Sequence, residues 1–331
     1  MKAWLKVGEE RMKIAYDQVA AEIGLPATAV EKDFWVSLML QSVFELKWAD
    51  QLVFKGGTSL SKGWNLISRF SEDIDLAIDR RAFGYDGKLG SHRRTKLRKT
   101  IRSSVMDELV HALDHNLSEN DIEAEVTVRY DKNTDADPSI IDIEYRSLTE
   151  PTEYLTSRIV LEINARSLFE PFENREIKPL IAPAFSKLDI KPSLKPIPCV
   201  LPGRTFLEKV FLLHEEFQKK EMDIRTDRLS RHMYDLERIM DTDFADSALS
   251  DRVLYFDIID HRKHLTRVSG IDYEKHRPGA INLIPPDSVL KNWESDYNRM
   301  KESMIYGEAP SFDKLLERMT ELMSRINSLK F

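Results

Sequence analysis

Two short polar motifs, each attached to an apolar segment, constrain the fold of the first third of the chain more than any other feature. Residues 51–55 form an apolar run that ends at Gly56-Gly57, and residues 73–78 alternate acidic with apolar side chains. Both runs have the length and pattern of strands. Residues 58–67 between them have apolar side chains at helical spacing, and Thr58 is a suitable N-cap. The sequence therefore predicts two adjacent strands joined by a glycine turn and a helix.

The polar residues of this segment suit the binding of phosphate and metal. Two glycines let the backbone approach a phosphate closely, and the amides of Thr58 and Ser59 are oriented donors for an anion at a helix start. On a strand, Asp73 and Asp75 face the same side. Two carboxylates that converge on one point can bridge the magnesium ions of a phosphoryl transfer. The sequence therefore predicts a pair of Mg²⁺ ions, with Mn²⁺ as an alternative, beside a nucleotide site at Gly56, Gly57, Thr58 and Ser59.

A third magnesium ligand is predicted further along the chain. Glu162 is a polar residue midway along an apolar segment that has the β-branched, alternating pattern of a strand. Glu162 could instead form an ion pair with Arg158 or Arg166. Arg69 leaves a similar choice, because its guanidinium could reach a nucleotide phosphate or pair with Glu72.

The charge of the chain limits any interaction with nucleic acid to a local surface. Asp and Glu total 56 against 49 Lys and Arg, a formal net charge of -7, which gives no overall attraction to a polyanion or to an anionic membrane. One segment stands out as a cluster of positive charge, at His92, Arg93, Arg94, Lys96, Arg98, Lys99 and Arg102. This cluster could bind the phosphates of an RNA acceptor, or it could be a solvated helix face paired to acids elsewhere.

Cysteine content and hydropathy favour a cytoplasmic protein. Cys199 is the only cysteine, so the chain has no internal disulfide and no pair of thiolates for a metal site. The N-terminus becomes charged within its first turns, unlike the apolar core of a secretory signal. The most apolar run, residues 34–44, is far too short to span a bilayer. We therefore expect no association with a membrane.

The order of the predicted elements indicates an α/β (α+β) fold in two lobes. The first lobe, residues 1–190, is predicted to contain a mixed β-sheet flanked by helices, with strands at residues 51–55, 73–78, 122–130, 139–145 and 157–165 and helices at 8–23, 28–47, 58–67 and 92–117. The second lobe, residues 191–331, is predicted to be mostly helical. The proline-rich residues 179–202 are expected to be an extended segment between the lobes.

Six motifs together resemble the AbiEii/AbiGii toxin family of nucleotidyltransferases, within the DNA polymerase beta-like superfamily. The resemblance extends over about residues 29–306. The motifs are Glu31-Lys32-Asp33-Phe34-Trp35, Gly56-Gly57-Thr58-Ser59-Leu60, Arg69-Phe70-Ser71-Glu72-Asp73-Ile74-Asp75-Leu76, Glu162-Ile163-Asn164-Ala165-Arg166-Ser167, Phe206-Leu207-Glu208-Lys209 and Arg231-His232-Met233-Tyr234-Asp235-Leu236. The resemblance implies that Asp73 and Asp75 bind metal and that the glycine motif contacts the phosphates of an NTP.

The resemblance also implies a reaction and partners. It implies transfer of a nucleoside monophosphate from an NTP to an acceptor, with loss of pyrophosphate, by the toxin of a bacterial toxin–antitoxin or abortive-infection (phage defence) system. The implied acceptor is the 3′ end of tRNA, and a cognate antitoxin protein is the implied partner. By position, Lys209 would neutralise triphosphate charge, and Asp235 would orient that lysine or help to activate the acceptor hydroxyl. Both residues would be supplied by the helical lobe across a cleft.

Other functions are alternatives to this interpretation. The same residues could nucleotidylate a protein or a small molecule, or the chain could be a nucleotide-binding interaction module without turnover. A glycosyltransferase that uses Asp-x-Asp is a third alternative, but it does not predict Gly-Gly-Thr one helix upstream. His214 and His232 lie near Lys209 in the pattern, and we expect them to be structural residues rather than zinc ligands.

Overall fold

The chain forms two compact units. The computed structural model describes all residues except 88, 130–138, 151–154 and 165–170. The first unit comprises Met1–Asn65 and Arg69–Val200, and the second comprises Leu66–Ser68 and Leu201–Phe331. The division falls after residue 200 rather than residue 190, because the end of the proline-rich segment pairs with the sheet of the first unit.

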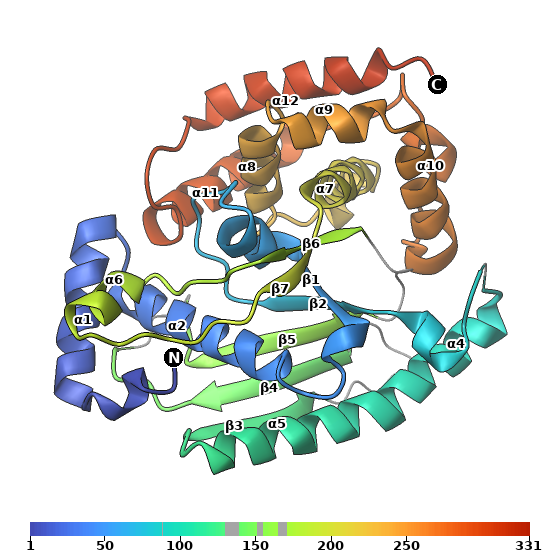
Figure 1. Cartoon of the computed structure of the whole chain (residues 1–331). Helices are drawn as coiled ribbons and strands as arrows, with labels where there is room; N and C mark the ends of the chain where they lie inside the picture. The colour runs from blue at the N-terminus through green and yellow to red at the C-terminus, as the bar shows by residue number, and fades with distance from the viewer. Residues whose placement is uncertain (88, 130–138, 151–154, 165–170) are drawn as a thin grey trace. The chain divides into compact units, whose positions relative to one another are not determined.

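A mixed sheet organises the first unit (Figure 1). In the described residues its strand order is β3-β4-β5-β2-β1-β7-β6. The strands are β1 (Leu52–Lys55), β2 (Ile74–Ile78), β3 (Ala124–Arg129), β4 (Ser139–Tyr145), β5 (Arg158–Asn164), β6 (Phe172–Arg175) and β7 (Ile197–Val200). Strand β1 is parallel to β7 and β2 is parallel to β5, whereas the other pairs are antiparallel. Together with the surrounding helices, this sheet confirms the predicted α/β fold class.

Helices of the first unit agree largely with the predicted ones. They are α1 (Glu9–Ile23), α2 (Ala27–Val43), α3 (Gly56–Thr58) with a π-helical turn (Ser59–Gly63), α4 (Ser91–Thr100) with a π-helical turn (Ile101–Met106), α5 (Asp107–Glu119) and α6 (Ala182–Lys187). The helix that was predicted to begin at Thr58 begins at Gly56 and so includes both glycines. Gly56 adopts a left-handed φ of 77°, from which the chain turns directly into the helix.

One face of the sheet forms the main core of the first unit. Ile141, Ile143 and Tyr145 of β4 are buried on this face, and the Tyr145 ring stacks on Trp35 of α2 with centroids 4.6 Å apart. Helix α5 contacts both α2 and β3 (Figure 1). Because side chains alternate along a strand, the residues between these apolar ones belong to the opposite face.

The opposite face carries a row of mainly polar residues that crosses five strands. The register pairs Lys55 with Asp75, Asp75 with Glu162, Glu162 with Ile140, and Ile140 with Arg129. Residues directly opposite each other on paired strands share a face, so all five side chains belong to this face. We call these five residues the polar row. Asp75 and Glu162, the two predicted metal ligands that lie on strands, are neighbours in this row. A basic residue, Lys55 or Arg129, stands at each end.

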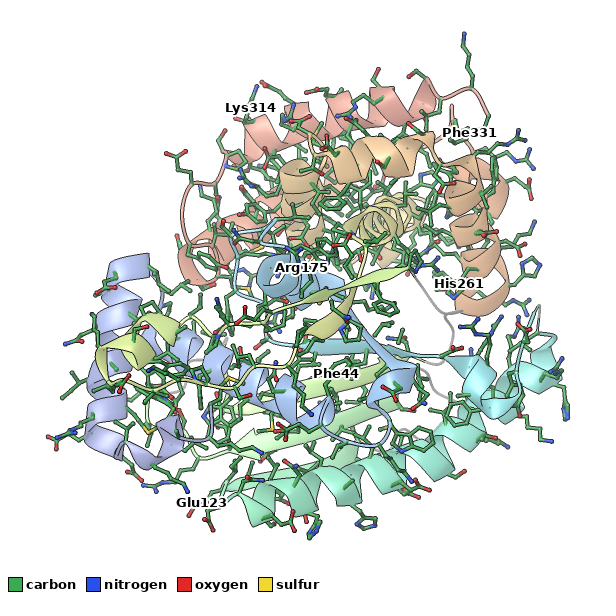
Figure 2. The ribbon with its side chains drawn as sticks, in the orientation of Figure 1. Phe44, Glu123, Arg175, His261, Lys314 and Phe331 are labelled. Carbon is green, nitrogen blue, oxygen red and sulfur yellow. The ribbon has the colours of Figure 1, made fainter. Side chains whose placement is uncertain are left out.

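Residues 179–202 differ from the prediction of an extended segment. They contain α6 and β7, and β7 pairs with β1 on one side and β6 on the other. The side chain of Arg175 in β6, which is labelled in Figure 2, fixes this edge further. Its guanidinium lies 4.7 Å from the centre of the Trp64 ring, and its Nε donates to the carbonyl of Gly63. Pairing with distant strands, which no local pattern reveals, determines the structure of this segment.

The second unit is mostly helical, as its apolar spacing predicts. Its main helices are α7 (Pro202–Glu216), α8 (Ser230–Ile239), α9 (Asp243–Ser250), α10 (Arg252–His261), α11 (Asp287–Ser303) and α12 (Phe312–Asn327). Helix α7 contacts α8, α9 and α10, and its buried side chains form the centre of the unit. Across the described part of the chain, no helix combines the length and apolar character needed to cross a membrane.

Candidate functional site

The glycine turn and Asp75 are in close contact. Gly56 has a φ of 77°, and a Cβ atom at this position would lie 2.0 Å from Oδ2 of Asp75. A side chain is thus excluded both by the left-handed backbone and by the carboxylate. The turn that was predicted to bind phosphate and the strand that was predicted to bind metal are therefore neighbours, as the sequence motifs require.

Replacing Gly56 with alanine is expected to lower both stability and activity. The left-handed backbone alone costs roughly 1–2 kcal/mol for a residue with a Cβ atom. The new Cβ atom also displaces the Asp75 carboxylate, and a displacement of about 1 Å at a reacting group can lower a rate by about 100-fold. Thermal unfolding and the rate of nucleotide transfer measure the two effects.

Gly84 provides the matched control for this substitution. It has a φ of 75°, and a Cβ atom at this position would meet nothing within 4 Å beyond its own chain neighbours, so Gly84→Ala incurs the backbone cost alone. If Gly84→Ala and Gly56→Ala reduce stability and activity equally, the contact with Asp75 has no role.

Thr58 and Ser59 are buried, which restricts the groups that they can offer to a nucleotide. The Thr58 hydroxyl donates to the carbonyl of Asp73 at 2.5 Å and lies 2.8 Å from the Ser71 hydroxyl. The amide of Ser59 donates to the carbonyl of Gly56, because the helix begins at Gly56. Thr58 therefore braces the segment that leads into β2. The amides nearest the helix start, those of Gly57 and Thr58, are the better candidates for phosphate donors.

Arg69 lies against the glycine turn. Its side chain is 1% exposed, and a Cβ atom on Gly57 would lie 2.6 Å from Nη2 of Arg69. Nη1 of Arg69 also donates to the carbonyl of Phe70 at 3.2 Å. The guanidinium therefore supports the backbone of the turn, and its contact with a nucleotide phosphate stays a prediction.

The residue types on the polar row fit a divalent cation. Asp75 and Glu162 are directly paired on adjacent parallel strands, where neighbouring backbones are about 4.8 Å apart. Asp73 lies two residues before Asp75, just ahead of β2. In the part of the chain that the structure describes, no three Asp, Glu, His or Cys side chains converge into a ready metal cluster. The backbone thus brings the carboxylates to one face, and their convergence on Mg²⁺ stays a prediction that requires side-chain rotation.

Lys32 and Asp33 of α2, two members of the charged triplet Glu31-Lys32-Asp33, hold these motifs in place. Lys32 forms a buried ion pair with Glu72 at 2.6 Å, next to Asp73 in sequence. Asp33 accepts from Lys62 at 2.5 Å, just beyond the glycine motif, and from the amide of Leu180 at 2.6 Å. Sequence reasoning assigned no role to these residues. The signal that could have revealed one is three consecutive charges within an apolar helix, since buried charges need partners.

A second missed feature is an ion-pair cluster around Asp142 of β4. Arg129 of β3 donates to both Asp142 oxygens, from Nε at 2.8 Å, and Nε of Arg158 lies 3.6 Å from Oδ1 of Asp142. Arg158 thus pairs with Asp142, whereas Arg166, the other alternative partner of Glu162, lies outside the described residues. An acid between isoleucines in β4 was the available signal, the same signal that identified Glu162.

The second unit contains a buried ion pair between the two residues that the resemblance implicated. Nζ of Lys209 on α7 lies 2.9 Å from Oδ2 of Asp235 on α8, and their side chains are 8% and 0% exposed. Nδ1 of His232 lies 3.3 Å from the same Nζ atom. Asp235 and His232 together fix the position of the ammonium group. This geometry suits an orienting role for Asp235.

His214 belongs to a separate structural cluster. Its Nδ1 accepts from the amide of Asn282 at 2.9 Å, and its ring packs edge-on against His276. Burial, with the charge of His276 as a smaller cause, lowers the pKa of His214 to about 4. A histidine that is neutral at physiological pH and bound to a backbone amide is structural, as the sequence predicts.

The comparison with protein families identifies the chain. A family model described as "Nucleotidyl transferase AbiEii toxin, Type IV TA system" matches residues 38–318. The chain belongs to this family. It is therefore a nucleotidyltransferase toxin of the type IV toxin–antitoxin class, which implies an antitoxin partner, and the resemblance found in the sequence is confirmed.

Solved structures support the same fold for this AbiEii-family chain. MenT4, a nucleotidyltransferase toxin from Mycobacterium tuberculosis H37Rv, superposes with a TM-score of 0.52 at 18% sequence identity. The match covers 95% of this chain and 90% of that chain. No curated protein matches the chain. At this identity the likeness to MenT4 shows the fold and leaves the acceptor to be proposed.

The basic cluster of this AbiEii-family chain lies on α4 and the π-helical turn after it. Arg93, Lys96 and Lys99 are exposed, whereas Arg94 and Arg98 are half-buried. The Arg93 guanidinium lies 5.7 Å from the centre of the Tyr85 ring. These exposed charges are available to an anionic acceptor, and their role in binding it stays a prediction.

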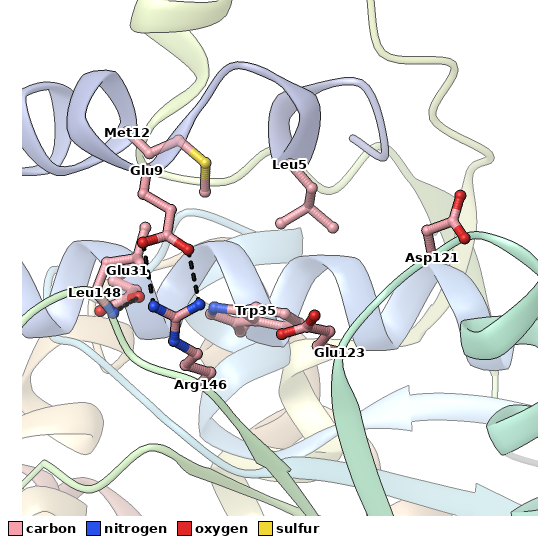
Figure 3. Close-up of a pocket in the computed structure, with 9 residues that line it drawn as sticks. All are labelled: Leu5, Glu9, Met12, Glu31, Trp35, Asp121, Glu123, Arg146 and Leu148. Atoms are coloured by element: carbon pink, nitrogen blue, oxygen red, sulfur yellow. Dashed lines mark hydrogen bonds and ion pairs between the residues drawn. The ribbon is translucent and has the colours of Figure 1, made fainter.

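A cavity of about 220 Å³ lies on the α2 side of the sheet (Figure 3). Arg146 in its wall is bound by both carboxylate oxygens of Glu9, at 2.7 and 3.2 Å. The described lining residues include none of those predicted to bind nucleotide, metal or acceptor; they are Leu5, Glu9, Met12, Glu31, Trp35, Asp121, Glu123, Arg146 and Leu148. Trp35 packs on the apolar face of the sheet, so this cavity is separate from the polar row.

Proposed function

We propose that this toxin transfers a nucleoside monophosphate from an NTP to the 3′ hydroxyl of an RNA, with tRNA as its acceptor, and that it does so with Mg²⁺ in the cytoplasm. The observation that carries the proposal is the pairing of Asp75 with Glu162 beside the Gly56 turn. Family membership supports nucleotidyl transfer. The choice of RNA rests on the sequence resemblance and on exposed basic residues of the first unit.

Each residue of the proposed site has a defined task. The helix start at Gly57 and Thr58 binds the triphosphate, and Asp73, Asp75 and Glu162 hold the metal. Bound Mg²⁺ supplies charge neutralisation for the phosphates. Mn²⁺ can replace it, because both ions prefer oxygen ligands.

The proposal also assigns a role to Lys209 and specifies the bonds that form and break. Lys209, oriented by Asp235, neutralises negative charge on the triphosphate. The acceptor oxygen bonds to the α-phosphorus while the bond from that phosphorus to the bridging oxygen breaks. Pyrophosphate leaves with the electron pair, and the hydroxyl proton passes to solvent.

A transfer assay tests this function. The purified chain is incubated with Mg²⁺ and each of the four NTPs, labelled at the α-phosphate, in the presence of deacylated tRNA or of a protein extract. Label in tRNA, abolished by EDTA, is the expected result, because carboxylate-bound magnesium is required. Label found only in protein would show that the acceptor is a protein and not RNA. No label in any reaction would contradict nucleotidyl transfer by this chain.

A further inference from the structure

Arg129 and Arg158 are exposed arginines held in place by a largely buried acid. Their side chains are 41% and 46% exposed, whereas the Asp142 side chain between them is 11% exposed. The two hydrogen bonds from Arg129 fix the plane of its guanidinium. An exposed arginine normally loses entropy when it binds an anion, and this anchoring reduces that loss.

The two arginines share the face of the proposed reaction site. Arg129 ends the polar row, and Arg158 lies four residues before Glu162 on β5, so its side chain points to the same face. Its hydrogen bonds to Asp142 raise the pKa of the Arg129 guanidinium, and the negative charges of Asp142, Glu162 and Asp73 add smaller contributions in the same direction. Arg129 therefore lies within the electrostatic field of the acids predicted to bind metal.

The order of strands gives the two ends of the row different tasks. The glycine turn follows β1, whereas Arg129 lies on β3, with Asp75 and Glu162 on the strands between. In an in-line phosphoryl transfer, the attacking hydroxyl and the leaving pyrophosphate lie on opposite sides of the α-phosphorus. If the triphosphate lies at the glycine turn, the acceptor approaches from the side of β3 and β4.

We propose that Arg129 and Arg158, positioned by Asp142, form a subsite that binds the phosphate backbone of a single-stranded RNA acceptor next to its reacting 3′ hydroxyl. This inference rests on the proposed function for the position of the reaction, and it adds residues that bind the acceptor. Planar guanidinium groups bind phosphate through paired hydrogen bonds, and loss of one such contact weakens binding of a strand uniformly over sequences. Asp142 acts as a positioning residue.

RNA binding without nucleotide or metal tests the subsite. The probe is a fluorescein-labelled single-stranded oligoribonucleotide with a free 3′ hydroxyl, and its anisotropy is followed at several salt concentrations. Arg129→Ala is expected to raise the Kd about 10-fold and to reduce the salt slope by roughly one phosphate contact. Arg129→Lys, which keeps the charge but loses the paired geometry, is expected to give an intermediate Kd.

Arg146→Ala is the matched control, because Arg146 is also exposed and also paired to a carboxylate, but lies at the cavity on the other face. Its Kd is expected to stay within about twofold of the wild type. Circular dichroism shows whether each variant is folded, and if Arg129→Ala is not, Arg129→Lys and Arg158→Ala give the comparison. Equal binding by folded subsite variants and by the control overturns the proposal, and so does an absence of binding by the wild type.

The transfer assay separates this inference from the function on which it rests. In that assay, Arg129→Ala is expected to raise the KM for RNA about 10-fold and to leave the KM for NTP unchanged, because the subsite contacts the acceptor alone. If the wild type transfers nucleotide and Arg129→Ala has an unchanged KM for RNA, the subsite is contradicted and the proposed function is not. If the wild type shows no transfer but its binding of RNA depends on Arg129, the proposed reaction is contradicted and the RNA subsite is not.

Discussion

Replacing Asp75 with asparagine is expected to lower the rate of nucleotidyl transfer by roughly 1000-fold while the chain stays folded. Loss of a metal ligand removes about 4 kcal/mol of stabilisation from the transition state, and each 1.36 kcal/mol corresponds to a factor of about ten. Asparagine has nearly the same shape as aspartate, so it can occupy the space beside Gly56. The measurement is the single-turnover rate with a labelled NTP and tRNA.

The melting temperature of Asp75→Asn shows whether its activity is lost through loss of metal binding or through unfolding. Asp75 is paired with a like charge, Glu162, on one side and with an opposite charge, Lys55, on the other, so without a cation the two effects of removing its charge oppose each other. The melting temperature of Asp75→Asn without metal should therefore lie close to that of the wild type. Added Mg²⁺ should raise the melting temperature of the wild type, because a ligand that binds the folded state stabilises it, and should have little effect on the variant.

Asp79→Asn is the control for this experiment. Asp79 follows the same strand, pairs with exposed Arg81 and belongs to no proposed site. It should retain full transfer and the response to Mg²⁺. Equal transfer by Asp75→Asn and the wild type would exclude Asp75 as a metal ligand.

Local patterns were sufficient to predict the strands that carry Asp75 and Glu162, because a strand pattern is complete within a few residues. The alternation of acidic and apolar residues around Asp75 identifies both the strand and the polar face, since strand periodicity is short. Glu162 was found as a polar residue in an apolar strand, and the register places it opposite Asp75. Backbone periodicity therefore carried enough information for the acids on the strands.

The features that the sequence did not reveal depend on contacts between distant segments. Strand β7 was missed because its partners β1 and β6 are separated from it in sequence, and because the proline content of residues 179–202 favoured an extended segment between the lobes. The ion pair of Lys32 with Glu72 joins residues 40 positions apart. The start of the helix at Gly56 depends on one left-handed residue, which a helical pattern cannot locate.

Replacing Lys209 is expected to abolish transfer, but the single variant is not a clean test. Lys209→Met leaves Asp235, which is fully buried, without its cation, and removing one partner of a buried pair costs about 3–5 kcal/mol. A fall in activity could then reflect unfolding. The double variant Lys209→Met/Asp235→Leu removes both charges, and replacement of a buried ion pair by apolar residues of similar size is often neutral for stability.

The double variant therefore separates the two roles of the pair. It is expected to recover the melting temperature lost in Lys209→Met, while its kcat stays about 100–1000-fold below that of the wild type, because the ammonium group that is proposed to neutralise the triphosphate is absent. Thermal unfolding and steady-state transfer are measured on the same preparations. If the double variant recovered both stability and kcat, Lys209 and Asp235 would serve only to hold α7 against α8. Recovery of stability alone assigns the lysine to the reaction, since the contact between the helices would then be intact without it.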